Sequence, residues 1–225
     1  MHRRGKNILT YFVKALVLTS LLFIAKEGLQ ATPEKNIPKH RDSKTLPKST
    51  VVHEISIPLN QIESYLNELT TLKASFKQLN PDGTVHEGLF FLSRPGKMRL
   101  KYKPPVNQVI ISDGHFLIFH NPDLDEVTHI PLESTPAELL VKARVNLKKD
   151  ARILETGSTG THYFVKVARP DDLEAGTLTL VFDQSPLTLR EWIIEDQNQR
   201  ITHVILDHVQ KDISLPEALF IYSNH

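Results

Sequence analysis

Residues 85–121 read VHEGLFFLSRPGKMRLKYKPPVNQVIISDGHFLIFHN and contain four short runs rich in Val, Ile, Leu and Phe. Turn-forming residues interrupt or follow the runs at Arg94-Pro95-Gly96, Ser112-Asp113-Gly114 and Asn121-Pro122. Short β-prone runs separated by glycine and proline are typical of antiparallel strands joined by tight connections. This stretch therefore predicts a mainly β fold.

The same pattern continues to the end of the chain, with further turns at residues 157–160 and 183–186. The predicted strands are 85–93, 98–103, 108–113, 116–120, 126–131, 152–155, 161–168, 177–183, 187–196 and 201–209. About ten strands at this spacing, without alternating helices, predict a barrel or a strongly curled sheet.

A helix is predicted before the first of these strands, over residues 59–79. Leu59, Ile62, Leu66 and Leu69 recur at spacings of three and four residues, which places them on one face of a helix.

A second helix is predicted from Ser134 to about Arg144. Thr135 can act as its N-cap, Pro136 suits the first helical position, and Glu138 can complete a capping box. Two amphipathic helices can cover the open mouth of a curled sheet and so form a lid over an apolar pocket. The lid side chains expected to face the sheet are Leu66, Leu69, Leu139 and Leu140.

The first 31 residues have the features of a secretory signal peptide. A basic start is followed by an apolar stretch over residues 8–25 and then by small or apolar residues before Ala31. A retained membrane anchor is the alternative, although Lys14 interrupts the apolar stretch. We expect export to the periplasm with cleavage after Ala31.

Residues 32–57 are spotted with proline and lysine and predict a flexible linker, or alternatively a basic tether to a membrane surface. Residues 58–225 then form the folded domain.

Charge and cysteine content exclude several classes of protein. The chain has 27 basic and 26 acidic residues, and five of the basic ones fall in the first 31 residues with a single acid. The remaining body is mildly acidic and is a poor match for nucleic acid. Because the chain has no cysteine, it cannot form disulfides or be lipid-anchored through that residue.

No residue pattern in the sequence indicates catalysis. Ser158 lies between glycines in a short turn rather than in a nucleophile elbow, and the eleven histidines lack the spacing of zinc ligands. A Gly-rich phosphate loop is also absent. We therefore expect no catalytic residues, no metal site and no cofactor.

The sequence contains an ordered series of short motifs. The series begins with LKASFKQ at residues 72–78 and continues with Gly88 and the strand leading into RPGKMR at residues 94–99. Next come SDG at residues 112–114 and FHNP at 119–122, and the latter leads into DEVT at 125–128. The series ends with STP at 134–136, the start of the second predicted helix, and with a late strand that contains Trp192.

This series resembles the LolA family of periplasmic lipoprotein carriers. The resemblance implies an unclosed antiparallel β-barrel of about ten or eleven strands, covered by a lid of α-helices. It implies that the ligand is the acyl chains of outer-membrane lipoproteins. The implied partners are an inner-membrane ABC transporter of the lipoprotein-release type, which delivers the cargo, and an outer-membrane receptor lipoprotein, which accepts it.

The resemblance and the strand period together define the expected site. Alternate strand residues should line the acyl-chain cavity, because successive side chains of a strand point to opposite faces. These cavity residues are Phe90, Leu92, Leu100, Tyr102, Leu117 and Phe119.

Two further residues receive specific roles. Arg94 would bond to the lid helices and hold the cavity shut, with a salt bridge at the strand end as the alternative. Met98 would contact cargo or a partner at the mouth, with an ordinary core position as the alternative.

The function expected on this basis is that of a monomeric periplasmic chaperone that carries lipoproteins to the outer membrane. Three alternatives remain open. One is a regulatory domain of the same fold that senses lipid or lipoprotein in the cell envelope. The others are an enzyme acting on a lipid or glycan, disfavoured by the missing catalytic pattern, and the outer-membrane receptor, disfavoured by the missing cysteine.

Overall fold

The computed structural model describes residues 59–223, which comprise one large sheet and three short α-helices. The helices are α2 (Leu59–Glu68), α3 (Glu138–Val141) and α4 (Leu147–Asp150). The strands are β1 (Thr71–Leu79), β2 (Val85–Ser93), β3 (Lys97–Tyr102), β4 (Val109–Asp113), β5 (Phe116–Asn121), β6 (Glu126–Pro131), β7 (Arg152–Thr159), β8 (His162–Ala168), β9 (Thr177–Gln184), β10 (Leu187–Glu195) and β11 (Ile201–Lys211).

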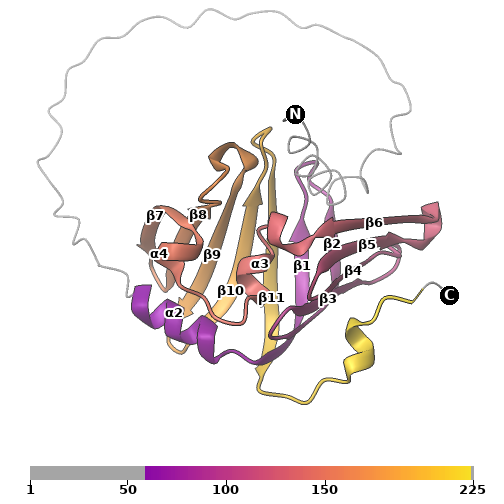
Figure 1. Ribbon diagram of the computed structural model, residues 1–225, viewed down its shortest axis with the longest axis horizontal. Helices are drawn as coiled ribbons and strands as arrows, with labels where there is room; N and C mark the ends of the chain where they lie inside the picture. The colour runs from indigo at the N-terminus through magenta and orange to yellow at the C-terminus, as the bar shows by residue number, and fades with distance from the viewer. Residues whose placement is uncertain (1–58, 224–225) are drawn as a thin grey trace, which may run out of the picture.

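The eleven strands form a single antiparallel sheet in the order β6-β5-β4-β3-β2-β1-β11-β10-β9-β8-β7. The sheet curls, and the helices lie across its concave side (Figure 1). Its two outer strands, β6 and β7, do not pair with each other. The fold is therefore an unclosed barrel. The strand pattern predicts the curled sheet, and the family resemblance implies that the barrel is unclosed.

The topology explains why the lid lies where it does. The chain leaves the sheet at β6, one edge, and enters it again at β7, the other edge. Residues 132–151, which include α3 and α4, must therefore cross the open side of the curled sheet. The helix α2, which precedes β1, lies on the same side as α3 and α4, so that all three helices cover the open side of the sheet (Figure 1).

The prediction of one helix over residues 59–79 is wrong in its second half. The helix α2 ends at Glu68, and residues 71–79 form β1, in which Leu72, Ala74, Phe76 and Gln78 are buried at every second position. Leu72 and Phe76 are four residues apart, so they fit a helical spacing as well as an alternating one. Pairing with both β2 and β11 decides in favour of the strand. The β-branched Thr70 and Thr71, which have a lower helix propensity, favour the end of the helix before this strand.

The predicted helix from Ser134 to Arg144 is also shorter than expected. Only Glu138–Val141 is α-helical, and the hydroxyl of Thr135 donates to the carbonyl of Leu132 at 2.8 Å. The capping box therefore does not form, because Thr135 closes a preceding 3₁₀ turn over Leu132–Ser134 instead. The helix α4 was not predicted; the side chain of Asn146 caps it by accepting from the backbone N–H of Lys149.

A second apolar cluster lies on the convex face of the sheet and is covered by the C-terminal segment. Phe91, Ile111 and Ile118 point away from the barrel interior yet are at most 9% exposed, and Phe220 is 3% exposed. The segment is fixed by a hydrogen bond from Arg99 to the carbonyl of Leu219 at 2.8 Å. This segment runs beneath β3 and β4 in Figure 1.

The expected signal peptide (residues 1–31) and linker (residues 32–57) lie outside the described residues. Within residues 59–223, no helix is both long enough and apolar enough to cross a bilayer.

Candidate ligand cavity

The interior of the curled sheet is lined by apolar side chains from both halves of the barrel. The six residues expected at the cavity wall all face the interior, each at most 6% exposed: Phe90, Leu92, Leu100, Tyr102, Leu117 and Phe119. Leu89 is half-buried, and Phe91 lies in the outer cluster. The predicted register is therefore the one that the sheet adopts, whereas ligand contact by these residues stays a prediction.

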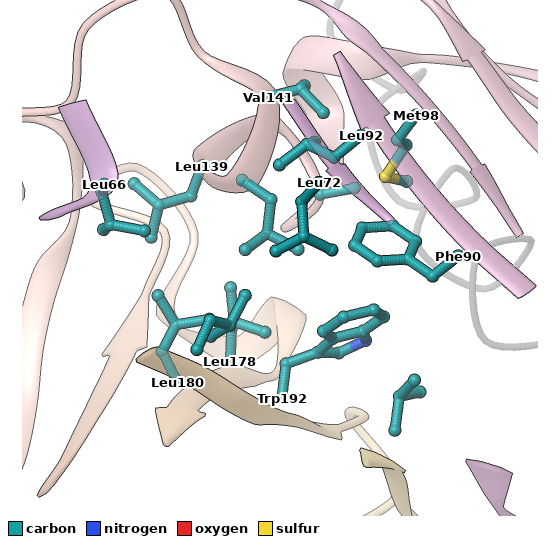
Figure 2. Packing of buried hydrophobic residues seen from close by; sticks show 14 of the residues in the cluster. Leu66, Leu72, Phe90, Leu92, Met98, Leu139, Val141, Leu178, Leu180 and Trp192 are labelled. Atoms are coloured by element: carbon teal, nitrogen blue, oxygen red, sulfur yellow. The ribbon is translucent and has the colours of Figure 1, made fainter. Parts of the chain in front are cut away.

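The opposite half of the sheet supplies a wall that sequence analysis did not identify. Trp192 of β10 stacks edge-on against Phe90, with ring centroids 5.0 Å apart, and Leu178 and Leu180 lie beside it (Figure 2). Leu178, Leu180 and Phe182 occupy every second position of β9, and all three are buried. Their alternation is visible in the sequence and could have identified this second wall.

A hollow remains between these walls and beneath α3. It is lined by Met98, Leu100, Leu117, Phe119, Ala137, Leu140, Leu178 and Trp192, among others. Its free volume is about 40 Å³, little more than the share of one water molecule in the liquid. Pockets that hold small molecules usually measure several hundred Å³. The lid must therefore move before a ligand as large as an acyl chain can enter.

Arg94 ties the lid helices to the sheet. Its Nε donates to the carbonyl of Lys142 at 2.9 Å, its Nη2 donates to the same oxygen, and its Nη1 reaches the carbonyl of Leu69 at 3.5 Å. Lys142 follows α3 and Leu69 follows α2, so one guanidinium joins the C-terminal ends of two helices. Carbonyls at such ends lack partners within the helix and favour a cation.

Partial burial lowers the pKa of Arg94 from its usual value, but arginine remains protonated in proteins. The geometry therefore agrees with the role expected for Arg94 rather than with a salt bridge at the strand end. The role itself stays a prediction until lid opening is measured.

Further polar contacts hold the lid, and sequence analysis missed them. Asn67 of α2 donates to the carbonyl of Val145 at 2.9 Å and accepts from the N–H of Val145 at 2.8 Å. The carboxylate of Glu63 accepts from the N–H of Leu147 at 2.9 Å. These contacts join α2 to the crossing segment, and no sequence motif marks them because their partners lie about 80 positions apart.

The four lid leucines are buried as expected: Leu66, Leu69, Leu139 and Leu140 are at most 8% exposed. Leu69 lies just after α2 rather than within it. Met98 is 4% exposed and lies in the cavity wall next to Leu92 and Phe90 (Figure 2). The structure thus places Met98 inside the cavity rather than at an open mouth.

A chain of hydrogen bonds runs from the cavity wall to the β1–β2 turn. The hydroxyl of Tyr102 donates to Gln78 at 2.6 Å, Gln78 donates to Asn80 at 2.7 Å, and Asn80 donates to the hydroxyl of Thr84 at 2.9 Å. Burial raises the pKa of Tyr102 far above its usual value, against the smaller effect of the Gln78 hydrogen bond. Tyr102 therefore serves as a neutral hydrogen-bond donor.

We expect Tyr102→Phe to lower the free energy of unfolding by about 1–3 kcal/mol, because the buried side-chain oxygen of Gln78 loses its hydrogen-bond donor. Urea denaturation of the two proteins measures this difference. Tyr163→Phe is the matched control, since Tyr163 is half-buried and its hydroxyl has no hydrogen bond within residues 59–223; a change within about 0.5 kcal/mol is expected there. Equal effects at both positions would show that the buried chain of hydrogen bonds contributes nothing.

Within the described part of the chain, no group of three histidine or acidic side chains is placed to hold a metal ion. The rings of His120 and His129 contact the ring of Tyr222, with centroids 5.3 and 6.0 Å away.

Fold and site together define a half-open antiparallel barrel with an apolar interior and a helical lid. The family model described as outer membrane lipoprotein carrier protein LolA matches residues 67–223. The chain therefore belongs to the LolA family, as its motifs indicate.

Several individual proteins are similar to this chain. The outer-membrane lipoprotein carrier protein of Methylococcus capsulatus is 29% identical over 175 residues, which cover 74% of this chain and 83% of the relative. That of Nitrosomonas europaea is 26% identical over 175 residues, covering 73% and 84%. A crystal structure of a LolA superfamily protein from N. europaea is 14% identical and covers 72% of this chain and 97% of its own, with a TM-score of 0.40.

Proposed function

We propose that this protein is a periplasmic carrier that binds the acyl chains of lipoproteins and delivers them to the outer membrane. The observation that carries the proposal is the apolar cavity, which is closed by a lid held through a few polar contacts. Membership of the LolA family and the names of its relatives support the same function.

The energies of binding and closure are of similar size. A hydrogen bond to a charged group contributes about 1.5–3 kcal/mol, and burial of one methylene contributes about 0.8 kcal/mol. Burying roughly two to four methylenes therefore offsets one bond of Arg94. An entering acyl chain can open the lid, and the closed form can in turn help to expel it.

The remaining parts of the proposal follow from this cycle. The cargo would be an acylated outer-membrane lipoprotein, received from an inner-membrane ABC transporter of the lipoprotein-release type and passed to an outer-membrane receptor lipoprotein. Residues 1–31 would direct export to the periplasm, and residues 32–57 would form a flexible linker. Residues 58–225 would form the carrier domain, which would bind the cargo as a monomer. Met98 would contact the acyl chains from the cavity wall.

A reversible lock on the lid tests the proposal. Asn67→Cys combined with Val145→Cys places one thiol on α2 and one on the crossing segment, which touch through the Asn67 hydrogen bonds. The chain has no other cysteine, and mass spectrometry after oxidation establishes the disulfide between the two. The oxidised variant should lose at least about 90% of its binding of a fluorescent triacylated peptide, and reduction should restore it.

Two controls accompany this experiment. The same peptide without acyl chains should not bind in either redox state, and the wild type should be insensitive to oxidant. If the wild type fails to bind the triacylated peptide, or if the confirmed disulfide leaves binding unchanged, the proposed carrier cycle is contradicted.

A further inference from the structure

A second hollow lies on the other side of α3, between the crossing segment and the strands β8 and β9. Its volume is about 230 Å³, several times that of the cavity hollow. The floor is apolar, with Leu139, Val167 and Leu178 among its members. Its charged residues are Glu133, Glu138, Lys142, Asp150, Arg169 and Asp171. We call this the rim hollow.

The rim hollow and the cavity are neighbours, with α3 and the residues on either side of it lying between them. Pro136 and Leu178 line both spaces, whereas Leu139 lines the rim hollow and its neighbour Leu140 lines the cavity. A displacement of α3 would therefore make the two spaces continuous. A ligand with its acyl part in the cavity would then have its polar part next to the rim hollow.

The charges of the rim hollow favour a neutral or basic occupant. Lys142 pairs with Asp150 at 3.1 Å and with Glu138 at 3.5 Å, and Arg169 pairs with Asp171 at 2.7 Å. Both cations are thus already paired with acids of the hollow. Glu133 is exposed and makes no ion pair within residues 59–223. Four carboxylates against two cations leave an excess of negative charge.

We propose that the rim hollow receives the peptide segment next to the acylated residue of the cargo, and that it prefers segments with basic over acidic side chains. This inference rests on the proposed carrier function and adds a polar subsite to its apolar one. It also places peptide recognition beside the lid contact, because Lys142 lines the rim hollow with its side chain and accepts from Arg94 with its carbonyl.

The test compares two triacylated peptides. Both begin with the acylated cysteine and a serine, and they differ only in the next two residues, Lys-Lys in one and Glu-Glu in the other. At low salt the full-length mature protein should bind the Lys-Lys peptide about fivefold more tightly, as expected for two partly exposed charge interactions. High salt should reduce this preference, because exposed charges are screened.

Glu133→Lys should abolish the preference while leaving the affinity for an uncharged triacylated peptide within about twofold. The matched control is Glu126→Lys, which makes the same change of charge at the exposed first residue of β6. Glu126 does not line the rim hollow, and Glu133 follows the other end of that strand. This control should keep most of the preference.

The outcomes separate the two proposals. Equal binding of the Lys-Lys and Glu-Glu peptides by the wild type would overturn the rim subsite and leave the carrier function standing. An equal loss of preference in Glu133→Lys and Glu126→Lys would also overturn it, because overall charge would then explain the effect. Failure of every triacylated peptide to bind would contradict the carrier function itself.

Discussion

Arg94→Leu should leave acylated cargo bound but slow its release to acceptor liposomes by at least about tenfold. The substitution removes the donors that reach the carbonyls of Lys142 and Leu69, so the closed lid loses stability relative to the open, loaded form. A tenfold change corresponds to about 1.4 kcal/mol, less than one typical charge-assisted hydrogen bond. The time course of transfer of a fluorescent triacylated peptide measures the effect.

Two variants control for charge and for shape. Arg190→Leu makes the same chemical change at a half-exposed arginine that lies 3.9 Å from Asp207, and we expect release at the wild-type rate. Arg94→Lys keeps the charge but lacks the planar fork of donors, so its release should be intermediate. Wild-type release by both Arg94 variants would show that Arg94 does not control the lid.

Gly88→Ala should lower the free energy of unfolding by about 3 kcal/mol, near the upper end of the usual effect of overpacking. A Cβ atom at Gly88 would lie 2.4 Å from the backbone oxygen of Lys101 and 2.5 Å from the Phe76 ring. Both neighbours are fixed, since Lys101 belongs to β3 and Phe76 is 1% exposed. Urea denaturation, with far-ultraviolet circular dichroism to confirm the fold, measures the loss.

Gly160→Ala is the control for this prediction. Gly160 has a φ of +59° and no atom within 4 Å of an added Cβ, so only the cost of the left-handed backbone applies, about 1–2 kcal/mol. Gly88→Ala and Gly160→Ala effects of equal size would contradict the steric argument, because crowding at Gly88 would then add nothing.

Strand positions could be predicted from the sequence because alternation and turn residues act locally. Ten of the eleven strands fall on predicted segments, and the register that places Phe90 and Leu92 inside follows from the period of two. β1 was missed because its apolar residues satisfy both periods. Only the pairing partners β2 and β11, which are remote from the local pattern, distinguish a strand there.

The lid contacts could be predicted only in part. Arg94 was identified through its motif, whereas Asn67 and Glu63 act on backbone groups that the fold brings close from distant positions. The covering of the convex face by the C-terminal segment was also missed, although the sequence of β2 contains a signal for it. Residues 89–92 are apolar without alternation, which indicates a strand buried on both faces.

The pairing of β1 with β11 bears on how the chain folds. Every other pair of neighbours in the sheet is consecutive in sequence, whereas Ser75 and Asp207, paired across β1 and β11, are 132 positions apart. Loop closure across such a separation costs more entropy than a hairpin, and distant contacts slow folding. The meanders β1–β6 and β7–β11 would therefore form first and associate afterwards. Until they do, the apolar surface that becomes the cavity is open to water, and the unpaired edges of β1 and β11 are free to join other chains.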